Sequence, residues 1–234
     1  MNHSRRRVAA AALAAALAVL APFAGASAAV ATSATVTLSE EDLAYFHETA
    51  DRFGVDAATQ EALLTKVEAG IPLDSSTGAS PVSVVTADVD GFHRTVETFA
   101  DGSIIGTDLE IPVELPEGVS ARGVSGCVLG TSAGVSYGQD CWIYSSSLTM
   151  GASFYSSYSR WSGGSSVWNW HSPAINIVGG SVTSQSWVHT PGGTTSSIQL
   201  QWNSQTGGVF TSNTWLRFNV SSTGGVSQTR GGAW

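Results

Sequence analysis

The sequence predicts a mainly β protein, in which a small N-terminal α+β unit (helical hairpin plus three-stranded meander) precedes an antiparallel β-sandwich. Apolar residues recur at helical spacing only near residues 39–70, and after residue 118 apolar and polar residues alternate with period two. Charge is also divided unevenly. Residues 30–118 hold 17 Asp and Glu against three basic residues, whereas residues 119–234 hold one acid, Asp140, against four arginines.

This uneven composition predicts a domain boundary. We expect an acidic α+β unit at 36–111, a linker at 112–118 and a Trp-rich β-sandwich at 119–234, which contains all eight tryptophans. The two stretches carry net charges of −14 (three bases minus 17 acids) and +3 (four bases minus one acid), which sum to −11. The absence of a basic footprint argues against a nucleic-acid partner.

Residues 1–28 have the composition of a secretory signal peptide. Arg5, Arg6 and Arg7 precede an apolar run at 8–23, and small residues near Ala28 offer a cleavage site. The apolar run is shorter than the roughly 20 residues needed to cross a bilayer. No later stretch is apolar enough to span one, so we expect a secreted, extracellular protein with no transmembrane segment in the mature chain.

Two short helices are expected in the acidic unit. Ser39 can cap the first helix and Asp56 the second, and Gly54 and Gly70 follow them as stop signals. Each helix has one apolar face, formed by Leu43, Phe46, Ala50 and Phe53 in the first and by Leu63, Leu64 and Val67 in the second.

Three strand-like runs follow, at 82–89, 92–99 and 103–111. Asp90-Gly91 and Asp101-Gly102 separate them, and Asp-Gly between strand-like runs is a strong hairpin signal. In the last run Asp108 and Glu110 take the face opposite to the apolar residues Ile105, Leu109 and Ile111. These runs predict the three-stranded meander.

The alternation beyond residue 118 predicts about six to eight sandwich strands. From 142 to 154 the even positions are mostly apolar, which predicts one strand with Trp142 in the core. Trp202 is likewise expected in the core, together with Ile198 and Leu200. Cys127 and Cys141 are the only cysteines, and in an exported chain they are expected to form a structural disulfide.

The motifs typical of catalysis are weak in this chain. Residues 130–134 and 134–138 both match G-x-S-x-G, and Asp140 and either His171 or His189 follow in hydrolase order. That motif requires a strand-to-helix elbow, but no helix is expected there, so we interpret the matches as chance. The two histidines have no acidic cluster beside them, so we predict no metal and no cofactor.

Two groups of tryptophans could bind a ligand. Trp215 shares a strand face with Arg217 and Asn219, and we expect that strand to pair with the one carrying Gln199 and Gln201. An aromatic plane among amide and guanidinium groups suits a sugar, whose C–H face stacks while its hydroxyls form hydrogen bonds. A solvated sandwich face with one exposed Trp is the alternative.

The second group lies within and after a Gly-Ser loop. In an extended strand Trp168 and Trp170 would point to one face and form a stacking platform for a polymer. The same residues, with the neighbouring Trp161 and His171, could instead plug the end of the sandwich.

Several segments resemble exported actinobacterial proteins that carry no assigned function. They are the Cys-x13-Cys-Trp spacing from Cys127, Leu-Thr-Met-Gly-Ala-Ser-Phe-Tyr at 148–155, Gly-Val-Asp-Ala-Ala-Thr-Gln-Glu-Ala-Leu-Leu at 54–64 and Phe-Ala-Asp-Gly-Ser at 99–103. The resemblance implies export and architecture, and no catalytic residue carries over from it.

The sequence thus leads to two hypotheses. The first is an exported non-catalytic module that binds a polysaccharide or cell-surface ligand. The second is a membrane-active or bacteriocin-like protein, in which the acidic unit is a pro-segment released by cleavage near residue 115. An enzyme is the least favoured class, because glycoside hydrolysis usually needs two facing carboxyl groups and the predicted sandwich has one acid.

Overall fold

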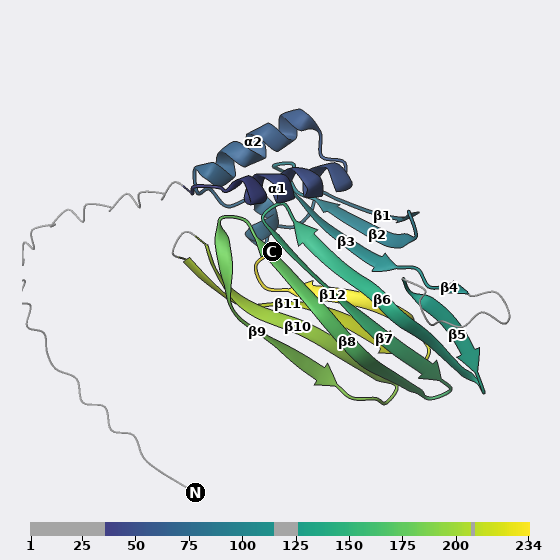
Figure 1. Ribbon diagram of the computed structural model, residues 1–234. Coiled ribbons are helices and arrows are strands. Elements are labelled where there is room, and N and C mark those ends of the chain that lie inside the picture. Colours follow the sequence, from purple (N-terminus) through teal and green to yellow (C-terminus); the bar gives the residue numbers. More distant parts are fainter. Residues whose placement is uncertain (1–35, 115–125, 207–208) are drawn as a thin grey trace, which may run out of the picture. The chain divides into compact units, whose positions relative to one another are not determined.

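The computed structural model describes residues 36–114, 126–206 and 209–234 (Figure 1). The expected signal peptide at 1–28 and residues 115–118 of the expected linker lie outside this range. Two α-helices and a short 3-10 helix come first: α1 (Glu40–Arg52), α2 (Ala57–Glu68) and η1 (Asp74–Ser76). The strands that follow are β1 (Ser83–Val89), β2 (Phe92–Thr98), β3 (Ile104–Glu110), β4 (Val113–Glu114), β5 (Val128–Ser132), β6 (Val135–Ser147), β7 (Met150–Trp161), β8 (Gly164–Ile177), β9 (Gly180–Thr190), β10 (Thr195–Thr206), β11 (Val209–Ser221) and β12 (Gly225–Gly231).

The helices begin where the capping residues predict. The Ser39 hydroxyl accepts a hydrogen bond from the Asp42 amide at 3.1 Å, and the Asp42 carboxylate accepts one from the Ser39 amide at 2.9 Å. Asp56 caps α2 by accepting from the Thr59 amide at 3.1 Å. These bonds satisfy amides that the first helical turn leaves without a partner, so both expected helices are confirmed.

The strands form two sheets, which confirms the mainly β fold class. Sheet 1 has eight strands and is centred on β6, which pairs with β3 and β5 on one side and with β7 on the other. Sheet 2 has four strands in the order β12-β11-β10-β9.

The expected meander is β1-β2-β3, and Asp90 and Gly91 turn its first hairpin with φ of 52° and 84°. Positive φ at both positions is the requirement of a type I′ turn.

The structure joins the two regions that composition separates. Strand β3 pairs with β6 from Ile105 opposite Ser147 to Leu109 opposite Ile143. Ile105 and Leu109 are buried in the same core as the sandwich residues. The expected division between 36–111 and 119–234 is therefore corrected to a shared sheet. Strand β3 pairs with β2 along one edge, and the backbone groups along its other edge form their hydrogen bonds with β6.

The main core lies between the two sheets. Sheet 1 contributes, among others, Ile143, Phe154 and Val167, and sheet 2 contributes the fully or almost fully buried residues Ile198, Leu200, Trp202, Leu216, Phe218 and Val220. Trp202 is thus in the core, as its register predicts.

Residues 142–154 form two strands instead of one. Ser147 and Met150 flank a two-residue turn between β6 and β7, and residues opposite each other across a hairpin point to the same face. The residues that face the core therefore have odd numbers in β6 (Cys141, Ile143) and even numbers in β7 (Phe154). The prediction for Trp142 was wrong: it lies half-buried on the outer face of sheet 1, with its indole 4.9 Å from the Tyr144 ring.

The helices pack on the outer face of sheet 1 around β3. Phe53 lies over Gly106, where an added Cβ would be 2.2 Å from the ring. Next to it Asp108, which is completely buried, accepts hydrogen bonds from Arg52 and Arg94. Strand β3 is consequently buried on both faces.

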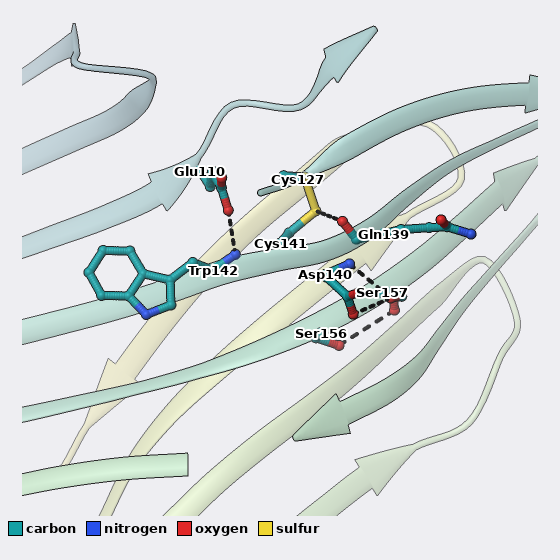
Figure 2. Close-up of a disulfide and its surroundings, with 8 residues drawn as sticks. All are labelled: Glu110, Cys127, Gln139, Asp140, Cys141, Trp142, Ser156 and Ser157. Atoms are coloured by element: carbon teal, nitrogen blue, oxygen red, sulfur yellow. Dashed lines mark hydrogen bonds between the residues drawn. A yellow bond between two sulfur atoms is a disulfide. The ribbon is translucent and has the colours of Figure 1, made fainter. Parts of the chain in front are cut away.

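The expected disulfide is present. Cys127 and Cys141 are bonded and buried, and they join the segment before β5 to β6 (Figure 2).

Candidate functional site

The structure brings the predicted residues of β10 and β11 together on the outer face of sheet 2. Gln199 is opposite Arg217, and Gln201 is opposite Trp215. Their neighbours in both strands point into the core, so these side chains point outward. Asn219 extends the same row, opposite Ser197.

A ladder of hydrogen bonds crosses this face. Arg217 donates from Nε and Nη2 to Gln199 Oε1 at 2.9 and 2.5 Å. Gln199 Nε2 then donates to Gln201 Oε1 at 3.0 Å, and Gln201 Nε2 donates to Ser186 Oγ of β9 at 3.0 Å. The ladder holds the guanidinium in a defined position, and this reduces the side-chain entropy that a ligand contact would otherwise cost.

The Arg217 guanidinium lies over the Trp215 ring, with 4.8 Å from Cζ to the ring centroid. The indole extends across Gly231 of β12, where an added Cβ would be 2.6 Å from its Cζ2. Asn219 Nδ2 donates to Thr229 Oγ1 at 3.1 Å. Trp215, Arg217 and Asn219 remain partly exposed, so the face presents an indole, a guanidinium and an amide in neighbouring positions.

Gln199 has a different place from the one expected. Only 6% of it is exposed, because the adjacent Arg217 and the β9 residues cover it. It therefore positions Arg217 instead of presenting an amide to a ligand. Sequence reasoning missed Ser186, Val188 (42% exposed) and Thr229, because strand alternation does not reveal which strands are neighbours.

Trp168 and Trp170 do not form a shared platform. Between the pairs Ser157–Trp168 and Tyr155–His171, β8 has one residue more than β7, and Asn169 adopts a φ of 51° there. After this bulge, the odd-numbered and even-numbered side chains of β8 exchange the faces of the sheet to which they point. Trp168 stays on the outer face and is 38% exposed. Trp170 instead packs against the sandwich core, with 4.8 Å between its ring centroid and that of His189.

The G-x-S-x-G matches lie in the β5–β6 hairpin, whose strands pair from Ser132 opposite Val135. An antiparallel hairpin has no strand-to-helix elbow, so these matches lack the geometry that the motif needs.

Across residues 36–114, 126–206 and 209–234, no three His, Cys, Asp or Glu side chains are arranged to bind a metal ion. No helix in the described part of the chain has the length and apolar character needed to cross a membrane.

No family model and no curated protein matches the chain. A crystal structure of the hypothetical protein lmo2686 from Listeria monocytogenes EGD-e is 16% identical and covers 60% of this chain and 94% of its own, with a TM-score of 0.31. A likeness at this TM-score carries no argument about function.

Proposed function

We propose that this protein is an exported, non-catalytic module that binds a polysaccharide on the outer face of sheet 2. The observation that carries the proposal is the ladder from Ser186 to Arg217, which holds a guanidinium over the partly exposed indole of Trp215. This ladder lies outside the hydrophobic core.

The chemistry of the face favours a neutral or weakly anionic, hydroxyl-rich polymer. Sheet 2 contains no Asp or Glu among its described residues, and Arg217 is the cation on its outer face, since Arg230 of β12 pairs with Glu97 of β2 at 2.7 Å. Indole and amide groups provide a stacking surface and hydrogen bonds without a strong net charge.

The disulfide is typical of proteins in oxidising compartments, which supports export.

The membrane-active alternative receives less support. Removal of residues 30–118 as a pro-segment would take away β3, whose Ile105 and Leu109 belong to the sandwich core.

The test is co-sedimentation of residues 29–234 with insoluble cellulose, chitin, xylan and purified bacterial cell wall. We expect binding to one of them, and we expect Trp215→Ala to weaken it by about 10-fold or more, equivalent to ~1.4 kcal/mol. Arg217→Ala should weaken it as well. Trp161→Ala is the matched control, since Trp161 is 40% exposed but lies at the end of β7 in sheet 1.

A urea unfolding curve checks that each variant stays folded. Failure of the wild-type protein to pellet with any of the polymers would contradict the proposal. Equal pelleting of the wild-type protein and Trp215→Ala would instead exclude this face as the site.

A further inference from the structure

A second group of polar and aromatic side chains lies on the outer face of sheet 1, away from the hydrophobic core. We refer to Asp140 (β6), Tyr155 and Ser157 (β7), and Trp168, Asn169 and His171 (β8) as the Asp140 cluster. The register places Tyr155 opposite His171, and Ser157 opposite Trp168.

Hydrogen bonds converge on one oxygen of Asp140. Its Oδ1 accepts from Asn169 Nδ2 at 3.0 Å and from Ser157 Oγ at 3.5 Å, and it lies 3.3 Å from His171 Nε2. The Asp140 amide donates to Ser157 Oγ at 3.0 Å (Figure 2). The His171 ring stacks on Tyr155, with 5.5 Å between centroids and 11° between planes. Three strands thus hold one carboxylate in place.

Backbone irregularities build this cluster. Asp140, Asn169 and Ser172 all have φ near +50°, and each lies where the pairing register shifts. Left-handed backbone at residues other than glycine costs roughly 1 kcal/mol or more, and bulges turn side chains to new directions. None of the three residues belongs to the hydrophobic core, although the bulge at Asn169 also turns the neighbouring Trp170 toward it.

The carboxylate is available to a ligand. Its side chain is 53% exposed, and among the described residues it forms no ion pair with an Arg or a Lys; the His171 Nε2 atom lies 3.3 Å from its Oδ1. Its Oδ2 accepts no hydrogen bond from the residues that the structure describes. Asp140 is also the sole acid between residues 119 and 234.

An exposed indole accompanies this carboxylate. Trp168 is 38% exposed and precedes Asn169, the residue that donates to Asp140. A carboxylate attracts an ammonium group, and an indole face contributes both stacking and cation–π attraction. The pair suits a cation that is carried on a ring with an apolar C–H face.

We infer that the Asp140 cluster binds a protonated amino sugar, as found in a glucosamine polymer. Asp140 Oδ2, which accepts no hydrogen bond from the described residues, pairs with the sugar ammonium, and Trp168 takes the C–H face of the pyranose ring. This site is separate from the outer face of sheet 2 and differs in charge, so it does not depend on the function proposed above.

Calorimetric titration with two matched probes tests this inference. One is the glucosamine hexamer at mildly acidic pH, where its amines are protonated, and the other is the N-acetylglucosamine hexamer, which has the same backbone without the charge. We expect the wild-type protein to bind the charged hexamer at least about 10-fold more tightly. Asp140→Asn should abolish this preference, and Trp168→Ala should weaken binding of the charged hexamer.

The controls separate this site from the other face and from misfolding. Trp215→Ala should leave binding of the charged hexamer unchanged. Asn tolerates left-handed backbone well, so Asp140→Asn should keep the wild-type urea midpoint. Equal affinity for both hexamers, or an unchanged preference in Asp140→Asn, would overturn the inference. Binding of hexalysine as tight as that of the glucosamine hexamer would overturn the assignment to a sugar.

Discussion

Replacement of Asp108 by Asn tests how the helices are attached to sheet 1. Asp108 is completely buried and accepts four hydrogen bonds, from Arg52 Nε and Nη2 at 3.0 and 2.5 Å and from Arg94 Nε and Nη2 at 2.8 and 2.9 Å. Asn has nearly the same size, but it is neutral and directs an NH2 group at one of the two cations. The substitution therefore removes the charge without leaving a cavity.

The expected cost follows from the burial of the three partners. Removal of one partner from a buried ion pair costs about 3–5 kcal/mol. The Arg52 side chain is 34% exposed and can regain water, whereas that of Arg94 is 15% exposed. We therefore expect the lower end, ~3 kcal/mol, which corresponds to a decrease of about 6–12 °C in Tm for a chain of this size.

Urea unfolding followed by circular dichroism measures this effect. The midpoint should fall for Asp108→Asn while the denaturant dependence stays the same, because the surface exposed on unfolding is unchanged. Asp88→Asn is the matched control, since the Asp88 side chain is 65% exposed and should change stability by less than ~0.5 kcal/mol. A free energy of unfolding for Asp108→Asn within that margin of the wild type would refute the role of the buried ion pairs.

Three further changes should alter stability through separate mechanisms. Gly106→Ala places a Cβ 2.2 Å from the Phe53 ring and should cost ~1–3 kcal/mol by overpacking; an unchanged urea midpoint would contradict this contact. Burial opposes ionisation of Asp101, but hydrogen bonds to its carboxylate outweigh it and lower its pKa from 3.8 to about 2. Its ionised form therefore stabilises the fold above about pH 4, and this contribution is lost as the pH falls through 2. Asp101→Asn should cost about 2 kcal/mol at neutral pH and almost nothing near pH 2, and an equal loss at both pH values would exclude linkage. Serine in place of both Cys127 and Cys141 should cost ~3 kcal/mol in urea unfolding, because the bond no longer restricts the unfolded chain; an unchanged free energy of unfolding would contradict this.

Features that depend on residues close together in the chain could be predicted from the sequence. The caps Ser39 and Asp56 and the turn at Asp90-Gly91 act through hydrogen bonds and φ angles within a few positions, so composition and spacing were sufficient. The outward row of Trp215, Arg217 and Asn219 followed from period two, because no described bulge interrupts β11 between Thr214 and Ser221.

The sequence alone therefore determined the mainly β class, the helical hairpin, the meander and the faces of regular strands. Only the tertiary structure decided that β3 pairs with β6, that Trp142 faces outward, and that Trp168 and Trp170 point to opposite faces. Strand pairing joins residues far apart in the chain, and one extra residue in a bulge reverses every later side chain. The alternation of apolar and polar residues did not reveal the bulges at Asp140 and Asn169, yet these bulges bring a carboxylate, an imidazole and an exposed indole to one surface.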